Sequence, residues 1–265
     1  MDIRRWFKNS HFCTGRAGLR FWYGEPLGRR LLEIEQRKLD AILPNLFGYH
    51  LLQVGCMVDE DLLGASRISH RIVVDVIDGK PVASISMQGQ PERLPVASDS
   101  VDVVVLPHTL EYEADPHQAL REVDRILIPE GHVVILGFNP WSFWGLRRLF
   151  RRRRYNTYPW CGRFRSLPRI KDWLSLLGFD IVMTSGYFFR PPIQHDAVMR
   201  RLRFIETAGA RWFSMLSGAY LLVAKKRTST LTPIQPRWRP RRSLIGAEMP
   251  EPTTRNGSCL DADEG

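Results

Sequence analysis

Residues 100–108, "SVDVVVLPH", contain a nearly continuous apolar run that is too short and too rich in valine to suit a helix. Such a run is typical of a strand that is buried on both faces. Strands of this kind lie inside parallel sheets, which need helices on both sides. This segment therefore predicts an α/β domain with a central, mostly parallel sheet.

The rest of the chain alternates in the same way between strand-like and helix-like segments. Strands are predicted at 49–55, 71–77, 81–87, 100–108, 131–138, 179–188 and 219–226, and helices at 25–43, 115–127 and 169–178. A weaker helical pattern covers 195–208. The order predicts a Rossmann-like, seven-stranded, mostly parallel sheet with helices on both faces.

Terminal residues mark the ends of these helices. Asp115 can accept hydrogen bonds from the first free N–H groups of its helix, Pro116 suits the first helical position, and Gln118 completes a capping-box pattern. Gly178 is a predicted C-terminal cap. The helix at 25–43 has one apolar stripe, which is interrupted only by Glu35.

The turn after the first strand is the candidate ligand site, because open parallel sheets bind ligands beyond the carboxyl ends of their strands. Gly55 ends that strand, and Asp75 follows it by 20 residues at the end of the second strand. This spacing suits an acid that accepts hydrogen bonds from the ribose hydroxyls of an adenosine ligand. The alternative is that Asp75 only forms a turn.

A specific motif covers residues 94–139. Its pieces are Leu94-Pro95, Ser100-Val101-Asp102, Leu110-Glu111-Tyr112, Asp115-Pro116, Glu122, Arg125, Leu127, Pro129 and Gly131. They resemble the S-adenosylmethionine-dependent methyltransferases of the ubiquinone/menaquinone-methylase-like group (type 11 methyltransferase domain). The sequence is most similar to uncharacterised bacterial methyltransferase-domain proteins with a degenerate glycine motif. The resemblance implies the class I methyltransferase fold, S-adenosyl-L-methionine as cofactor, and methyl transfer to a small molecule.

The first motif departs from the family pattern of an acid followed by three spaced glycines. Gln53 replaces the acid and Gly55 is kept, whereas Met57 and Asp59 stand where later glycines would be. Gln90 falls near the position of the acid that contacts adenine in the family. An amide oxygen still accepts a hydrogen bond, but it lacks the stronger charge-assisted bond of a carboxylate. These changes predict weakened or altered cofactor binding, and loss of binding is the alternative.

The resemblance implies a set of cofactor-binding residues, listed as Gln53, Gly55, Cys56, Asp75, Gln90 and Leu106. Just past the fourth strand, His108 is the candidate general base by its intrinsic pKa. The other interpretation is that His108 hydrogen-bonds a loop backbone.

The net charge is +10 and the isoelectric point about 9.8, which favours an anionic methyl acceptor or another acidic partner. The excess charge gathers at Arg147, Arg148, Arg151, Arg152, Arg153 and Arg154. An alternative hypothesis is a catalytically degenerate methyltransferase fold that binds nucleic acid, an anionic surface or a protein through these arginines. Nearby Trp141, Phe143, Trp144 and Trp160 would stack on bases or form the core of a lid.

The predicted organisation is an N-terminal helical extension at 1–45, a methyltransferase-like domain at 46–227 with an arginine/aromatic insertion at about 140–167, and a disordered basic tail at 228–265. Four widely spaced cysteines predict neither a disulfide framework nor a metal site. The sequence has no signal-peptide pattern and no apolar run long enough to span a membrane. We therefore expect a cytoplasmic protein.

Overall fold

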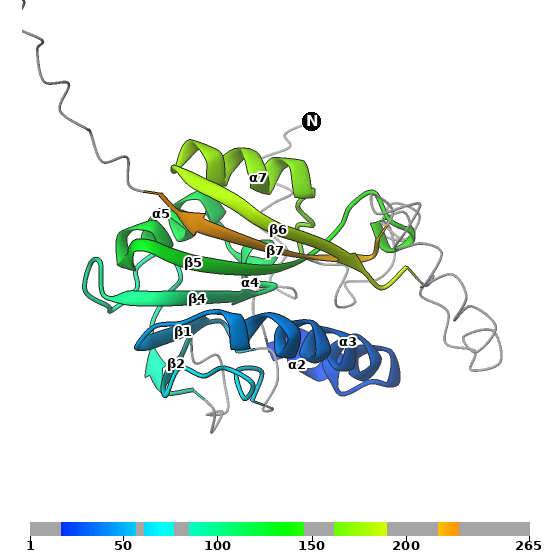
Figure 1. Cartoon of the computed structure of the whole chain (residues 1–265). Coiled ribbons are helices and arrows are strands. Elements are labelled where there is room, and N and C mark those ends of the chain that lie inside the picture. The colour runs from blue at the N-terminus through cyan, green and yellow to red at the C-terminus, as the bar shows by residue number, and fades with distance from the viewer. Residues whose placement is uncertain (1–16, 57–60, 77–84, 146–161, 190–216, 228–265) are drawn as a thin grey trace, which may run out of the picture. The chain divides into compact units, whose positions relative to one another are not determined.

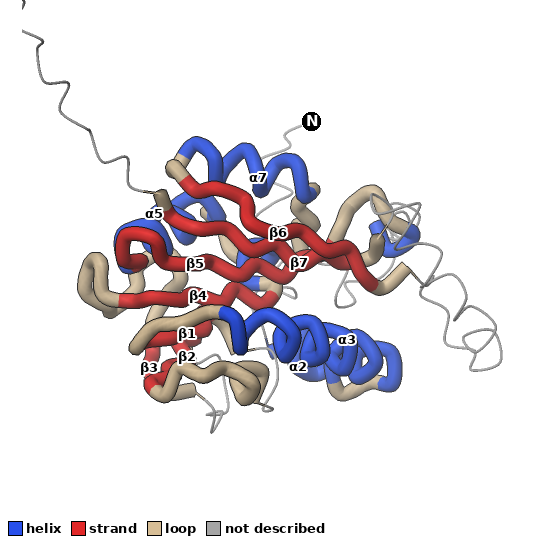
Figure 2. The backbone as a smooth tube through the Cα atoms, in the orientation of Figure 1, coloured by secondary structure: helices blue, strands red, loops and turns tan. Residues whose placement is uncertain are grey.

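A seven-stranded sheet in the order β3-β2-β1-β4-β5-β7-β6 forms the centre of the protein (Figures 1 and 2). The structure is a computed structural model that describes residues 17–56, 61–76, 85–145, 162–189 and 217–227. The strands are β1 (His50–Val54), β2 (His70–Asp75), β3 (Met87–Gln88), β4 (Val101–Pro107), β5 (Leu127–Phe138), β6 (Phe179–Tyr187) and β7 (Ala219–Lys226). All neighbouring pairs are parallel except those that β7 forms with β5 and β6. The sheet is therefore the predicted mostly parallel one.

The strand order reverses between β1 and β4, since the chain runs outward from β1 to β2 and β3 on one side and from β4 to β5 on the other. The carboxyl ends of these parallel strands meet at one edge of the sheet. This edge carries the turn after β1, Asp75 at the end of β2, and the residues that follow β4 and β5. It is the place where a doubly wound sheet binds its ligand.

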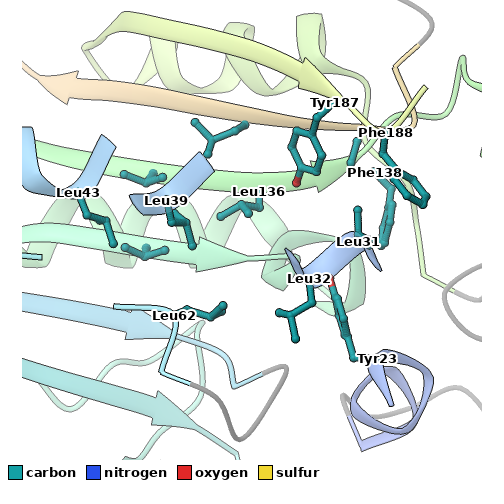
Figure 3. Close-up of a cluster of buried hydrophobic side chains, with 14 of the residues drawn as sticks. Tyr23, Leu31, Leu32, Leu39, Leu43, Leu62, Leu136, Phe138, Tyr187 and Phe188 are labelled. Atoms are coloured by element: carbon teal, nitrogen blue, oxygen red, sulfur yellow. The ribbon is translucent and has the colours of Figure 1, made fainter. Parts of the chain in front are cut away.

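The two N-terminal helices, α2 (Ala17–Tyr23) and α3 (Pro26–Ile42), cover one face of the sheet (Figure 1). Their buried side chains form one core with inward-facing residues of β1, β4, β5 and β7. Figure 3 shows Leu31 and Leu39 of α3 beside Leu136 and Phe138 of β5. The helix at 25–43 predicted from the apolar stripe is confirmed within one residue at each end.

On the opposite face, α5 (Pro116–Ile126) and α7 (Leu167–Leu176) pack against a second core. Asp115 accepts hydrogen bonds from His117 N at 3.0 Å and Gln118 N at 3.1 Å, as predicted for the N-cap. In a capping box, the side chain of Gln118 would accept a hydrogen bond from the backbone N–H of Asp115. Here that N–H donates to Glu92 Oε1 at 2.9 Å instead. Gly178 follows α7 with a left-handed φ of +82°, as its predicted capping role requires.

The connection from β1 to β2 spans only residues 55–69, and its described part, 61–69, forms turns and bends instead of a helix. Parallel strands are usually joined by a helix that covers the sheet. Here α2 and α3 lie over this part of the sheet instead (Figure 1). The described helices α2 and α3 thus share one hydrophobic core with the sheet.

The starts of two strands differ most from the prediction. The strand predicted at 81–87 is β3 at Met87–Gln88 within the described residues, and 81–84 lie outside them. β5 begins at Leu127, before the predicted start at 131, because Leu127 already pairs with Val101 ahead of an irregularity in the ladder. Glu130 in that irregularity has a φ of 67°, a left-handed conformation that is uncommon for residues other than glycine.

Some predicted segments lie outside the described residues: the helical pattern at 195–208, the arginines at 147–154, Trp160, and the tail from 228. In the part of the chain that the structure covers, no helix is long and apolar enough to cross a membrane.

Candidate functional site

The turn after β1 is held by bonds between its own predicted site residues. Gly55 has a φ of +95°, a conformation that favours glycine, and its N–H donates to Val74 O at 2.8 Å. The side chain of Gln53 donates from Nε2 to Gly55 O at 2.9 Å. Cys56 N donates to Asp75 Oδ2 at 2.9 Å. The structure thus brings Gln53, Gly55, Cys56 and Asp75 together at the edge where β1 and β2 end.

Asp75 lies at the centre of this group and is only 1% exposed. Its Oδ1 accepts a hydrogen bond from Val76 N at 2.8 Å, and its Oδ2 also accepts one from Arg20 Nη2 at 2.6 Å. Arg20 belongs to α2, and its Nε donates to Cys56 O at 2.7 Å. Sequence reasoning missed Arg20, because the only signal was a cation among the apolar residues of a short helix.

The other two predicted cofactor residues are placed differently. Leu106 is fully buried within β4 and packs in the core that α5 covers. Gln90 is exposed, just after β3, and forms an isolated bridge with Arg93. Among the described residues, neither side chain forms a hydrogen bond with Gln53, Gly55, Cys56 or Asp75. The cofactor roles of Leu106 and Gln90 therefore stay predictions.

His108 follows β4 in a left-handed conformation, with a φ of 50°, and is fully buried. Its Nε2 lies 2.8 Å from Glu35 Oε1, and its Nδ1 lies 3.3 Å from Glu111 Oε2. Glu35 also accepts hydrogen bonds from Tyr23 Oη at 2.9 Å and Tyr187 Oη at 3.0 Å. We call Tyr23, Glu35, His108, Glu111 and Tyr187 the buried cluster.

The charges of the buried cluster compensate one another. Burial by itself would lower the pKa of His108, but the charges of Glu35 and Glu111 outweigh burial and raise it from 6.5 to about 10. Burial, followed by the charge of Glu35, raises the pKa values of Tyr23 and Tyr187 well above 10. At neutral pH, His108 is therefore a cation between two carboxylates, and both tyrosines are neutral donors.

This geometry favours a structural role for His108 over both roles considered from the sequence. A protonated imidazole has no lone pair with which to accept a proton, and its nitrogens face carboxylates rather than the surface. Its ring nitrogens contact side chains of α3 and α4 (Thr109–Tyr112), not a loop backbone. The general-base role stays a prediction that the geometry does not favour. Glu35, the one polar residue on an apolar stripe, was the sequence signal for this cluster.

Residues 139–144 follow β5, at the same edge of the sheet as the turn at Gly55. Asn139 is buried, and its Oδ1 accepts a hydrogen bond from Trp141 N at 3.1 Å. Trp144 is 1% exposed and packs edge-on against Trp22 of α2, so it belongs to the core. Trp141 is 74% exposed. The aromatic residues of this segment thus divide between core and surface.

Arg165 lies beyond this segment, just before α7. Its guanidinium carbon is 5.6 Å from the ring centroid of Trp173, and its Nε is buried without a hydrogen-bond partner among the described residues. Burial first, and then the neighbouring charges of Arg163 and Arg169, lower the pKa of Arg165, whereas the charge of Glu111 raises it. A partly buried cation therefore lies close to the buried cluster.

Comparison with known proteins relates this geometry to a family. The chain is 37% identical over 211 residues to the uncharacterised protein YafS of Escherichia coli (strain K12), a match that covers 80% of this chain and 82% of that protein. A family model described as a methyltransferase domain matches residues 67–135. The chain belongs to the class I S-adenosylmethionine-dependent methyltransferases. The family-model match begins at residue 67, after the turn at Gly55. This turn is the part of the methyltransferase that lacks the spaced glycines of the family's first motif.

Other relatives support the fold of the methyltransferase. A solved S-adenosylmethionine-dependent methyltransferase from Thermotoga maritima is 16% identical, with a TM-score of 0.55 over 78% of this chain and 93% of that one. A methyltransferase of Haloferax volcanii, solved with its Trm112 activator, is 17% identical, with a TM-score of 0.56 over 79% and 98%. The malonyl-[acyl-carrier protein] O-methyltransferase of Methylovorus sp. (strain MP688) is 31% identical over 119 residues, which span 45% of this chain and 39% of that protein.

The described residues fit the cofactor of this family in kind and place. An acid ends β2, a glycine with positive φ ends β1, and the two meet at the switch point of the sheet. One contact opposes the fit, because Arg20 lies on the carboxylate of Asp75. Among the described residues, no group of three or more metal-ligating side chains is arranged to bind an ion.

Proposed function

We propose that this methyltransferase transfers the methyl group of S-adenosyl-L-methionine to the carboxylate of an anionic small molecule. The observation that carries the choice of acceptor is the geometry of the buried cluster. His108, just after β4, is fully buried with its two ring nitrogens 2.8 Å from Glu35 and 3.3 Å from Glu111, so it is not placed to act as a general base. A carboxylate acceptor needs no base, because it carries no proton to remove.

The cofactor end of the site is assigned to residues of β1 and β2. Asp75 would accept hydrogen bonds from the ribose, and the turn at Gly55 would let the ligand approach the backbone. Gln53 would contribute an amide where the family has an acid. When bound, the sulfonium cofactor supplies an already activated methyl group, so the protein chiefly has to hold the acceptor close and aligned.

The acceptor end is assigned to Arg165. A guanidinium binds a carboxylate with two parallel hydrogen bonds, and burial strengthens such bonds. Among the described residues, Nε of Arg165 has no hydrogen-bond partner, and the positive charges of Arg163 and Arg169 lie near it. Both features favour an anion at this place. The malonyl-[acyl-carrier protein] O-methyltransferase, one of the matched relatives, also acts on oxygen.

The test uses the full chain and radiolabelled cofactor. Calorimetric titration with S-adenosylmethionine and S-adenosylhomocysteine measures binding, and Asp75→Asn should weaken it about tenfold, because a charge-assisted hydrogen bond is lost. Asp180→Asn is the matched control, since Asp180 is 57% exposed on β6 and pairs with Arg227. Absence of binding at millimolar ligand, both by the wild type and by a variant in which Arg20 no longer lies on Asp75, would refute the cofactor assignment.

The acceptor is tested separately, with a pool of acidic metabolites and a methyl-labelled cofactor. A methyl ester releases labelled methanol in mild base, whereas methyl groups on nitrogen or carbon do not. Label that stays bound after base treatment would refute the carboxylate acceptor and leave the cofactor assignment standing. The nucleic-acid hypothesis is not part of this proposal, because the arginines at 147–154 lie outside the described residues and the comparisons do not support it.

A further inference from the structure

Arg20 joins the N-terminal helix α2 to the ends of β1 and β2. We call this part of the sheet, where the cofactor is proposed to bind, the cofactor edge. Its Nε donates to the carbonyl of Cys56 at 2.7 Å, and its Nη2 lies 2.6 Å from Oδ2 of Asp75. The arginine side chain is 17% exposed and that of Asp75 is 1% exposed. One guanidinium thus spans the turn after β1 and the end of β2, and it covers the acid between them.

The same carboxylate is the group to which the proposed function assigns the ribose. Its Oδ2 already accepts hydrogen bonds from Cys56 N and Arg20, and its Oδ1 accepts one from Val76 N. A ribose hydroxyl that approaches Asp75 needs both an exposed lone pair and room beside it. With 1% exposure, Asp75 offers no such room while Arg20 lies on it.

The helix that carries Arg20 has limited support of its own. α2 has seven residues, too few for a helix that is stable in isolation. Its place therefore depends on tertiary contacts, namely the buried side chains of Leu19, Trp22 and Tyr23 and the bonds of Arg20. Loss of Arg20 removes its two bonds from α2 to Cys56 after β1 and to Asp75 at the end of β2.

We propose that α2 is a lid over the cofactor edge and that Arg20 is its latch, which competes with the ribose of the cofactor for Asp75. This proposal rests on the proposed function, because it takes an adenosine-type ligand as the competitor. The closed lid shields Asp75, and cofactor binding requires that Arg20 leave the carboxylate. Arg20 therefore sets the affinity for the cofactor without taking part in methyl transfer.

The test compares S-adenosylhomocysteine binding by the full chain and by three variants. Arg20→Ala removes the latch, and Arg20→Lys keeps the charge but loses the planar fork that reaches two acceptors at once. Arg37→Ala is the matched control, because Arg37 is 77% exposed on α3 and lies 4.0 Å from Glu33. Calorimetry measures the dissociation constant, and hydrogen–deuterium exchange follows the amides of 17–23.

The lid predicts that Arg20→Ala binds S-adenosylhomocysteine at least about tenfold more tightly than the wild type, as expected when a competing charged hydrogen bond is removed. The affinity of Arg20→Lys for S-adenosylhomocysteine should lie between the affinities of Arg20→Ala and the wild type. Arg37→Ala should bind with the same affinity as the wild type. Without ligand, the amides of α2 should exchange faster in Arg20→Ala, and ligand should speed their exchange in the wild type.

The possible results separate the lid from the proposed function. If the wild type binds and Arg20→Ala binds equally or more weakly, the lid is refuted and the cofactor assignment stands. If only the Arg20 variants bind, the lid is supported and the wild type needs a further signal to open. If no variant binds at millimolar ligand, both proposals fail. Unchanged exchange of α2 in folded Arg20→Lys would also refute the lid, whatever the behaviour of Arg20→Ala.

Discussion

Replacement of Glu35 by glutamine tests whether the buried cluster holds the N-terminal helices on the sheet. Glu35 is 3% exposed and accepts three bonds, from Tyr23 of α2, His108 after β4 and Tyr187 of β6. Glutamine keeps the size of the side chain but removes its charge. His108 would then keep only Glu111, the more distant of its two carboxylates, at 3.3 Å.

The size of the effect follows from the pKa of His108. Its rise from 6.5 to about 10 on folding corresponds to about 5 kcal/mol, at about 1.36 kcal/mol per pH unit. The charge of Glu35, at 2.8 Å, raises this pKa more than the charge of Glu111 does. Breaking a buried ion pair by removing one partner typically costs about 3–5 kcal/mol. We therefore expect Glu35→Gln to lower the free energy of unfolding by about 3 kcal/mol at pH 7.

The pH dependence gives a second, independent signature. Because the folded pKa of His108 lies above the unfolded one, its contribution is fully present below pH 6.5 and is lost as the pH rises toward about 10. The folded state binds one more proton in this window, so the free energy of unfolding should fall by about 1.4 kcal/mol per pH unit. In Glu35→Gln, the pKa of His108 is lower and this slope should end at a lower pH.

Urea unfolding followed by tryptophan fluorescence at pH 7, 8 and 9 measures both quantities. Glu33→Gln is the control, because Glu33 is 65% exposed on the same helix. A loss below about 1 kcal/mol in Glu35→Gln, with the same slope as the wild type, would show that the cluster is not an ion-paired anchor.

Two further changes probe the elements that frame the site. Asp115→Ala removes the acceptor for two N–H groups at the start of α5. It should lower the free energy of unfolding, measured by urea titration, by about 1 kcal/mol. An unchanged midpoint of unfolding would show that the cap does not stabilise the fold. Gly28→Ala places a Cβ 2.2 Å from the backbone oxygen of Trp22, so the α2–α3 elbow must open. Hydrogen exchange of 17–23 should rise in this variant, and equal protection would contradict the close packing of the elbow.

Much of the fold could be predicted from the sequence, because its signals are local. The apolar run that became β4, the cap at Asp115 and the glycine at Gly178 each specify their own segment. Asp75 was found by its spacing from Gly55, and the structure places it at the predicted edge. These features depend on neighbours in the sequence, which pattern and spacing describe well.

The contacts that define the site could not be predicted in the same way. Arg20 meets Asp75 across 55 residues, and Glu35 meets His108 across 73. Nothing in the local pattern of α2 indicates where its arginine will reach. Arg20 reaches Asp75 because the N-terminal helices lie over the part of the sheet that the described residues of the β1–β2 connection, 55–56 and 61–69, leave without a helix.

The same arrangement has a consequence for how the chain folds. The helices that cover β1 and β4 precede them in the chain, and α3 is anchored to β6 by the Glu35–Tyr187 and Lys38–Ser185 bonds, which span 152 and 147 residues. Contacts of such high contact order form slowly, since a long loop must close before they stabilise anything. During synthesis, the apolar stripe of α3 would emerge long before its partner strands. This stripe is therefore the surface that a chaperone would have to shield until β6 and β7 complete the sheet.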